Sequence, residues 1–190
     1  IFRCDYSGKA GFYLKGRPLG IHAYGQVGRN VARIAKGFGM QVSALDPFVA
    51  DDVMIADGIT PVHSVEELYS NNQFVSLHIP ATPQTKKSVN EALISLMPAK
   101  GVLINTARKE VIDEDSLLQA LENRTDIMYV ADVRPDNADV LNEKFADRVF
   151  FTPKKMGAQT AEANINAGIA AAKQVVANLA DGWNKFQVNN

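Results

Sequence analysis

Residues 19–46 read LGIHAYGQVGRNVARIAKGFGMQVSALD and hold the strongest structural signal in the chain. An apolar run over residues 19–24 leads into a pair of glycines, and an amphipathic helical pattern follows. A second apolar run, over residues 40–45, ends in Asp46. This order of strand, glycine turn, helix, strand and acid is typical of a dinucleotide-binding βαβ unit.

The glycine turn has the residue types that a pyrophosphate needs. Gly25 lets the backbone approach the phosphates because it has no Cβ atom, and Gly28 lets the helix pack closely on the strand. The helix that begins here offers unpaired N–H groups and the positive end of its dipole. We therefore predict cofactor contacts at five consecutive positions, Tyr24, Gly25, Gln26, Val27 and Gly28.

The second strand ends in a carboxylate that indicates which cofactor binds. Asp46 follows Gly28 by 18 residues, close to the roughly 20 expected for an acid that binds the adenosine ribose. A carboxylate there repels a 2′-phosphate, so NAD is favoured over NADP, and the adjacent Pro47 is assigned to the same site. One departure is that Ala23 replaces the first glycine of G-x-G-x-x-G, and we expect its φ to stay negative.

The same helix also fits a purely structural role. Its apolar residues recur at helical spacing and predict a buried face. They are Val27, Val31, Ile34, Ala35 and Phe38. The acid at the end of the second strand favours a nucleotide site over that alternative.

Composition and charge argue against several classes of protein. The 190 residues are 46% hydrophobic and 22% charged with a net charge of −1, which suits one globular domain and no nucleic-acid partner. Cys4 is the single cysteine, so we expect no internal disulfide and a reducing, cytoplasmic setting. No apolar run approaches about 20 residues, so we expect no membrane span; we expect no metal site either.

Apolar runs alternate with helical patterns along the whole chain, which predicts an α/β fold. Expected strands cover residues 19–24, 40–45, 74–79, 101–105, 127–132 and 149–152. Besides the first helix, expected helices cover residues 65–71, 90–96, 113–122 and 158–181. Short connections predict a doubly wound parallel sheet, the architecture of a Rossmann NAD(P)-binding domain. Functional groups should then gather at the carboxyl ends of the strands.

Four segments together resemble the D-2-hydroxyacid dehydrogenase family. They are HAYGQVGRNVARIAKGFGMQVSALDP (22–47), SLHIPATPQTKKSVN (76–90), INTARKEVIDEDSLLQAL (104–121) and TPKKMGAQTAEAN (152–164). Within the family the chain is most similar to the phosphoglycerate dehydrogenase branch that lacks a regulatory domain. The resemblance implies hydride transfer between NAD and a small D-2-hydroxy acid, with 3-phospho-D-glycerate as the expected substrate.

The resemblance also assigns roles near the nicotinamide. Arg108 matches the arginine that pairs with the substrate carboxylate and polarises the keto oxygen, and it is assigned to the cofactor contacts as well. A planar guanidinium suits a carboxylate because it donates two parallel hydrogen bonds. Asp132 matches the aspartate that binds the nicotinamide carboxamide, while Thr106 and Ala107 offer backbone near the nicotinamide ribose.

Further residues are assigned to the walls of the cofactor pocket. His78, Pro80, Thr85 and Gly157 lie in segments that match the family's cofactor-binding stretches. His78 has an alternative interpretation as a buried, hydrogen-bonded histidine at a strand end.

The sequence departs from the family at three places. Lys109 replaces the glycine after the signature arginine, and Asn137, with Asp136 beside it, stands where the family has its catalytic glutamate. The catalytic histidine is absent, and either Lys154 or Lys155 takes its position. A lysine starts with a pKa near 10.4, so a carboxylate partner would make it a worse base, and loss of the glutamate suits a lysine acid/base. The alternative is a solvated or phosphate-binding lysine pair.

The family's enzymes have two domains, and this chain matches the cofactor domain. We expect residues 1–16 to be a loop from an absent substrate domain, 17–182 the Rossmann domain, and 183–190 a tail returning to the absent domain. Alone, this chain should bind NAD but turn over little substrate, and a homodimer is expected from the resemblance. Two other functions stay open, namely reduction of glyoxylate or hydroxypyruvate, and a non-catalytic NAD-sensing module.

Overall fold

The structure is a computed structural model that describes residues 13–157 and 159–185. The predictions that fall on Cys4, on most of the 1–16 loop and on the end of the 183–190 tail lie outside the described residues. The chain divides into two compact units, Ile1–Lys154 and Lys155–Asn190, which are described separately. The predicted boundaries at residues 16 and 182 stay predictions.

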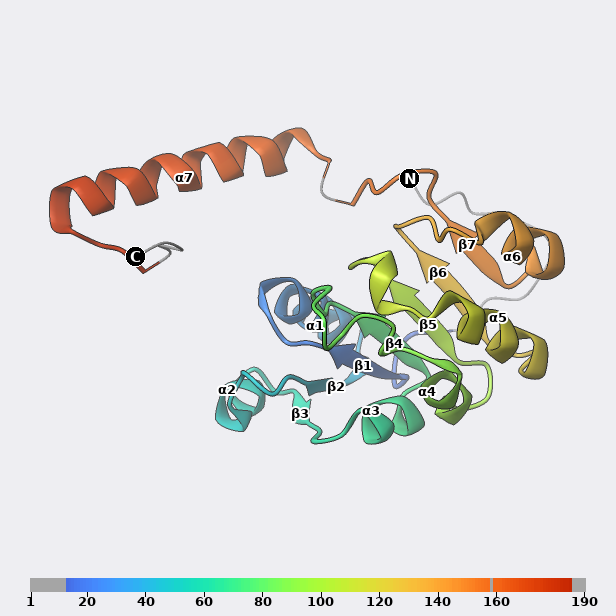
Figure 1. The fold of residues 1–190 in the computed structure, drawn as a ribbon. Coiled ribbons are helices and arrows are strands. Elements are labelled where there is room, and N and C mark those ends of the chain that lie inside the picture. Colours follow the sequence, from blue (N-terminus) through green and yellow to red (C-terminus); the bar gives the residue numbers. More distant parts are fainter. Residues whose placement is uncertain (1–12, 158, 186–190) are drawn as a thin grey trace. The chain divides into compact units, whose positions relative to one another are not determined.

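The first unit is built on a parallel sheet with strand order β3-β2-β1-β4-β5-β6-β7 (Figure 1). The strands are β1 Pro18–His22, β2 Gln41–Leu45, β3 Thr60–Pro61, β4 Phe74–Leu77, β5 Val102–Asn105, β6 Met128–Ala131 and β7 Val149–Phe151. The helices are α1 Gln26–Gly37, α2 Asp51–Ala56, α3 Val65–Asn71, α4 Glu91–Leu96, the short 3-10 helix η1 Lys109–Val111, α5 Glu114–Asn123 and α6 Ala138–Phe145.

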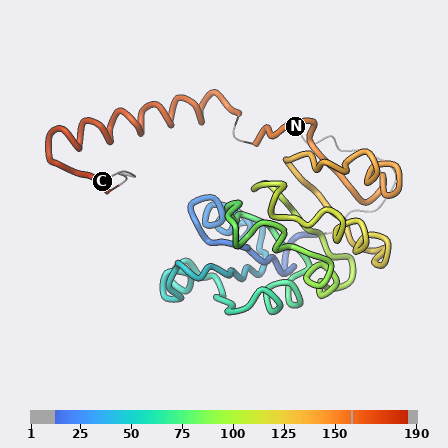
Figure 2. Tube along the Cα trace, viewed as in Figure 1, coloured from blue at the N-terminus to red at the C-terminus, as the bar shows by residue number. Residues whose placement is uncertain are grey.

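The chain begins in the middle of the sheet and reverses direction once. Figure 2 shows it moving from β1 to the β3 edge and then returning past β1 to β4 and the strands beyond. This reversal between β1 and β4 is the topological switch point, where open parallel sheets bind their ligands.

Alternating residues of the central strands pack into two separate hydrophobic clusters. Phe74 belongs to one cluster and Val75 to the other, and the same division separates Val102 from Leu103. Successive side chains of a strand point to opposite faces, so both faces of this sheet are covered. This confirms the predicted doubly wound α/β fold.

All six predicted strands are present, each within a few residues of its expected ends. The sequence pattern did not predict four elements, which are α2, β3, η1 and α6. Each is short: β3 has two residues and α2 has six, too few for a periodic pattern to stand out.

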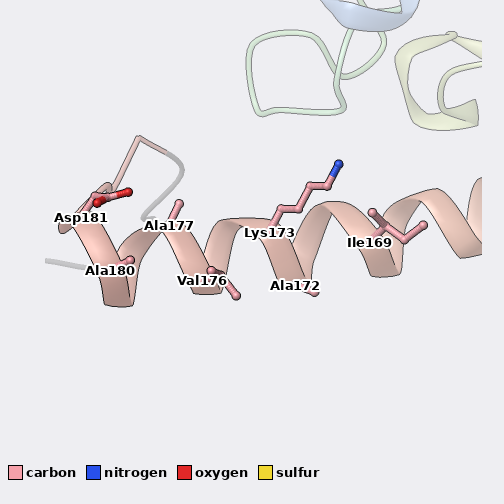
Figure 3. Close-up of a pocket in the computed structure, with 7 residues that line it drawn as sticks. All are labelled: Ile169, Ala172, Lys173, Val176, Ala177, Ala180 and Asp181. Atoms are coloured by element: carbon pink, nitrogen blue, oxygen red, sulfur yellow. The ribbon is translucent and has the colours of Figure 1, made fainter.

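The second unit contains one long helix, α7, over Ala161–Asp181. The Thr160 hydroxyl accepts the N–H of Ala163 at 3.0 Å and caps its start, and Gly182 ends it in the left-handed conformation with φ +66°. No residue of α7 is buried within the described part of the chain. A shallow hollow of about 460 Å³ runs along this single helix (Figure 3). It is lined by Ile169, Ala172, Lys173, Val176, Ala177, Ala180 and Asp181.

Within the described residues, no helix is both long and apolar enough to cross a membrane.

Candidate functional site

The strand register brings the predicted site residues into one row. His22 pairs with both Leu45 and Leu77, and the register continues through Asn105 and Ala131 to β7. Since all these strands are parallel, the residues one step past each pair lie side by side at the carboxyl edge. Across the sheet they are Asp46, Ala23, His78, Thr106, Asp132 and Thr152.

Ala23 has a conformation that differs from the prediction. Its φ is +80°, in the left-handed region, whereas we expected a negative φ. The reason is the tight turn between β1 and α1: the Ala23 N–H still donates to the Leu45 carbonyl at 2.9 Å, as a strand residue would. The chain must then reverse at once to start α1. The turn imposes the glycine-like conformation although the residue is alanine, which costs energy.

The two glycines of the turn have different surroundings. A Cβ atom at Gly28 would lie 2.3 Å from the Ala23 carbonyl oxygen, so a side chain there forces the turn to move. A Cβ atom at Gly25 would have nothing within 4 Å, so this glycine faces open space. Gly25 also caps α1 without any side-chain hydrogen bond. An open helix start with uncapped N–H groups fits a pyrophosphate.

The buried face of α1 also differs from the prediction. Its buried residues are the small ones, Gly28, Ala32 and Ala35, and of the five apolar residues expected to be buried only Ala35 is. Val31 is half-buried, but Val27, Ile34 and Phe38 are 63%, 52% and 59% exposed. Only small side chains fit where helix and strand approach closely, and the larger apolar residues are displaced to a neighbouring face of the helix.

Asp46 is held rigidly at the end of β2. Its Oδ2 atom accepts the N–H of Tyr24 at 2.8 Å, and its Oδ1 atom accepts the N–H of Phe48 at 2.9 Å. A carboxylate oxygen has two acceptor sites, so both oxygens can still accept ribose hydroxyls. Pro47 is exposed beside it.

Two histidines at the carboxyl ends of β1 and β4, His22 and His78, have lowered pKa values. Burial lowers the pKa of His22 to about 4, and burial also lowers the pKa of His78 to about 4. The His78 Nε2 atom lies 3.0 Å from the Ser76 hydroxyl, and His22 Nδ1 lies 3.3 Å from the Tyr69 hydroxyl. His78 is therefore hydrogen-bonded at the end of β4 and half-buried, and its contact with the cofactor stays a prediction.

The loop after β4 is tied together by its threonines. The Thr85 hydroxyl donates to the Pro80 carbonyl at 2.5 Å, and Thr82 and Thr85 exchange backbone-to-hydroxyl hydrogen bonds of 2.8 and 3.2 Å. Thr85 therefore fixes the loop that carries Pro80.

Arg108 lies on a loop that a buried asparagine holds in shape. Asn105 is completely buried; its Nδ2 donates to the Arg108 carbonyl at 2.9 Å, and its Oδ1 accepts the Ala107 N–H at 3.0 Å. The Arg108 side chain is exposed and its NH1 donates to the Ala107 carbonyl at 2.9 Å. The sequence analysis assigns no role to Asn105, although it lies in the segment 104–121 that also contains Arg108.

Asp132 also has a fixed side chain. The Thr152 hydroxyl donates to its Oδ1 atom at 2.9 Å, which connects the ends of β6 and β7. Asp132 thus stands at the predicted edge of the sheet, next in the row to Thr106.

Two of the three departures from the family pattern lie in one network. The Lys109 ammonium pairs with the Asp136 carboxylate at 2.5 Å, and this hydrogen bond raises the pKa of Lys109. The Glu114 carboxylate accepts the backbone N–H groups of both Asp136 and Asn137 at 2.9 Å. The Asn137 amide donates to the Glu114 carbonyl at 3.1 Å. Asn137 therefore ties the loop after β6 to the start of α5.

Lys154 and Lys155 lie at the junction between the two units, and both side chains are exposed. Their assignment, like that of Gly157 in the second unit, stays a prediction.

Known proteins identify the family. The sequence profile of the D-isomer specific 2-hydroxyacid dehydrogenase NAD-binding domain matches residues 4–154. The chain belongs to this family. The match confirms both the predicted family and NAD as the cofactor.

Relatives within this family have different activities. The chain is 33% identical over 166 residues to a D-3-phosphoglycerate dehydrogenase of Methanocaldococcus jannaschii, covering 87% of this chain and 32% of the relative. It is 30% identical to a hydroxypyruvate reductase of Thermotoga maritima, covering 87% and 54%. A solved structure of NAD⁺-bound 3-phosphoglycerate dehydrogenase from Entamoeba histolytica superposes with a TM-score of 0.85 at 42% identity, covering 96% and 58%. The chain thus spans only part of the length of these relatives.

Proposed function

We propose that this chain is the cofactor domain of an oxidoreductase that transfers a hydride between NAD and the D-2-hydroxy acid 3-phospho-D-glycerate. The observation that carries the proposal is the row of residues at the carboxyl edge of the sheet, which begins at Asp46 and includes Asp132. Arg108 extends from the loop between them, on a backbone that Asn105 holds. Cofactor binding alone does not need this arginine; recognition of a carboxylate does.

Each residue has a specific task in this proposal. NAD supplies the hydride acceptor or donor when it is bound. The uncapped start of α1 and Gly25 hold the pyrophosphate, and Asp46 holds the adenosine ribose. Asp132 accepts a hydrogen bond from the carboxamide. Arg108 binds the substrate carboxylate in a two-pronged contact and polarises the oxygen at the reacting carbon.

The proton is carried by one of the two lysines, Lys154 or Lys155. In ketone reduction the ammonium is already protonated at neutral pH and donates to the developing alkoxide. The residue at the family's glutamate position supports this assignment, because Asn137 carries no charge that would raise the pKa of a lysine.

Single substitutions test the lysine assignment. In the full-length protein, Lys154→Ala or Lys155→Ala should lower kcat by about 10²–10⁴-fold while NAD binding is unchanged. A Lys→Arg variant at the active position keeps the charge but should stay slow, because arginine does not give up its proton. Full turnover in both alanine variants overturns the acid/base assignment and leaves a phosphate-binding pair.

The substrate is tested by turnover of the full-length protein with NAD and a panel of 2-hydroxy acids. Preference for 3-phospho-D-glycerate supports the proposal. Preference for glycerate, with hydroxypyruvate in reverse, or for glycolate, with glyoxylate in reverse, supports the second enzyme function, which the similarity to a hydroxypyruvate reductase favours. No turnover with intact NAD binding supports an NAD-sensing module. In an active enzyme, Arg108→Lys should raise KM for the hydroxy acid because the two-pronged contact is lost.

The 190-residue chain by itself should bind NAD and show little turnover, because the residues that position substrate lie in the other domain of such enzymes. We further propose a cytoplasmic setting and a homodimer. The exposed apolar face of α1, formed by Val27, Ile34 and Phe38, is a surface that a second copy could cover. Light scattering should report a dimer, and Phe38→Glu should yield a monomer; a monomeric parent protein would refute this.

A further inference from the structure

Helix α1 has a third face, which is basic. Arg29, Arg33 and Lys36 follow one another at helical spacing, on the opposite side of the buried face from the exposed apolar residues. They line a cavity of about 320 Å³. The remaining residues around it are Tyr24, Gln26, Asn30, Asp57 and Ile59.

The charges around this cavity do not balance. Asp57 is its one carboxylate, and a single oxygen, Oδ2, accepts the Tyr24 hydroxyl at 2.9 Å and the Arg29 guanidinium at 3.1 and 2.9 Å. These hydrogen bonds, that of Tyr24 first, lower the pKa of Asp57. Its negative charge acts on Arg29 and also on Lys36, so the three cations and one carboxylate of the lining leave an excess of two positive charges.

Within the described part of the chain, Arg33 and Lys36 form hydrogen bonds only to neutral groups, although the charge of Lys36 also acts on the Asp57 carboxylate. Lys36 donates to the Asp57 backbone carbonyl at 2.5 Å. The Arg33 guanidinium has one hydrogen bond there, a long one of 3.4 Å to the Asn30 amide oxygen. An anion placed between them would gain two charge-assisted contacts without displacing a carboxylate.

We propose that this cavity binds a small phosphate-bearing ligand, a phosphate monoester or inorganic phosphate, at a site separate from the cofactor. Near neutral pH phosphate carries close to two negative charges, which match the excess of two positive charges in the cavity lining. The planar fork of Arg33 suits two phosphate oxygens. The cavity is larger than a phosphate ion, and the buried Ile59 side chain and the Tyr24 ring give an apolar wall for a carried group.

The test has to separate this cavity from the pyrophosphate turn, because Tyr24 and Gln26 belong to both. NAD at saturation occupies the turn, so inorganic phosphate is titrated calorimetrically into the NAD-saturated chain at low ionic strength. We expect binding in the millimolar range or tighter. Arg33→Gln should weaken it about tenfold or more, and Arg33→Lys should weaken it less because the charge is kept.

A matched control removes one positive charge elsewhere. Lys144 pairs with Glu122 on an exposed surface, and Lys144→Gln should leave the phosphate affinity within about twofold of the parent chain. The proposal is overturned if the NAD-saturated chain gives no binding heat, if Arg33→Gln binds like the parent, or if Lys144→Gln loses binding equally. Arg33 is exposed, so the variant should keep its fold, which circular dichroism verifies.

Discussion

The left-handed alanine of the cofactor turn predicts an unusual effect of a glycine substitution. Glycine normally destabilises, by about 0.4–1 kcal/mol, because it adds freedom to the unfolded chain. At Ala23, with φ +80°, glycine should also relieve roughly 1–2 kcal/mol of left-handed strain. Loss of a half-buried methyl group offsets about 0.4 kcal/mol of that gain. Ala23→Gly should therefore be neutral to stabilising.

A second alanine isolates the strain itself. Ala81 lies on an exposed irregular segment and does not have a positive φ, so Ala81→Gly measures only the unfolded-state cost. The difference between the two substitutions should be roughly 1 kcal/mol in favour of Ala23→Gly, measured as free energy of unfolding in urea. Equal destabilisation by both would refute the claim that the turn strains Ala23.

Four further perturbations follow from other contacts. Gly28→Ala should abolish NAD binding, since the new Cβ would lie 2.3 Å from the Ala23 carbonyl oxygen; fluorescence titration measures this. Asp46→Asn should reduce the preference for NAD over NADP about tenfold or more, measured by binding of each cofactor. The pKa of His22 is lowered by burial from 6.5 to about 4, so the unfolded chain takes up its proton first as pH falls. Unfolding free energy should therefore drop by about 3 kcal/mol between pH 6.5 and 4 from this group, and less in His22→Gln. Arg124→Met should cost about 2 kcal/mol or more, because its guanidinium donates to three backbone carbonyls in and just after the last turn of α4; thermal unfolding reports it.

A matched variant controls the Gly28 experiment. Gly37 ends the same helix, and a Cβ atom there would have nothing within 4 Å, so Gly37→Ala should keep NAD binding. Loss of binding in this variant would show that α1 tolerates no added methyl group, which would leave the contact with Ala23 unsupported. An unfolding free energy that stays constant as the pH falls below 6.5 would contradict the lowered pKa of His22.

Local patterns were enough for the fold and much of the site. The alternation of apolar runs and helical patterns depends only on residues close together in the sequence. It predicts a parallel sheet, because consecutive strands that are joined through helices run in the same direction. Parallel strands end at one edge, so Asp46, Thr106 and Asp132 could be expected together before any contact was known. The glycine spacing and the acid after the second strand identified the cofactor by the same logic.

Other features depended on how closely the elements pack. The φ of Ala23 is set by the distance between β1 and α1, and that distance also selects Gly28, Ala32 and Ala35 as the buried face of the helix. A periodic pattern identifies hydrophobic residues without regard to their volume, whereas close packing of a helix on a strand admits only small side chains. The larger apolar residues of α1 were therefore expected on the buried face, but they lie beside it.

Contacts between distant loops were equally invisible in the sequence. Lys109 and Asn137 appear in the sequence only as departures from the family pattern, and their contacts with Asp136 and Glu114 arise because the fold brings the loop after β6 against the start of α5. The basic cavity likewise arises because α2 ends beside α1 and presents Asp57 to Arg29. Tertiary structure decides such features, since hydrogen bonds and ion pairs act only over a few ångströms, between residues whose separation along the chain carries no periodic signal.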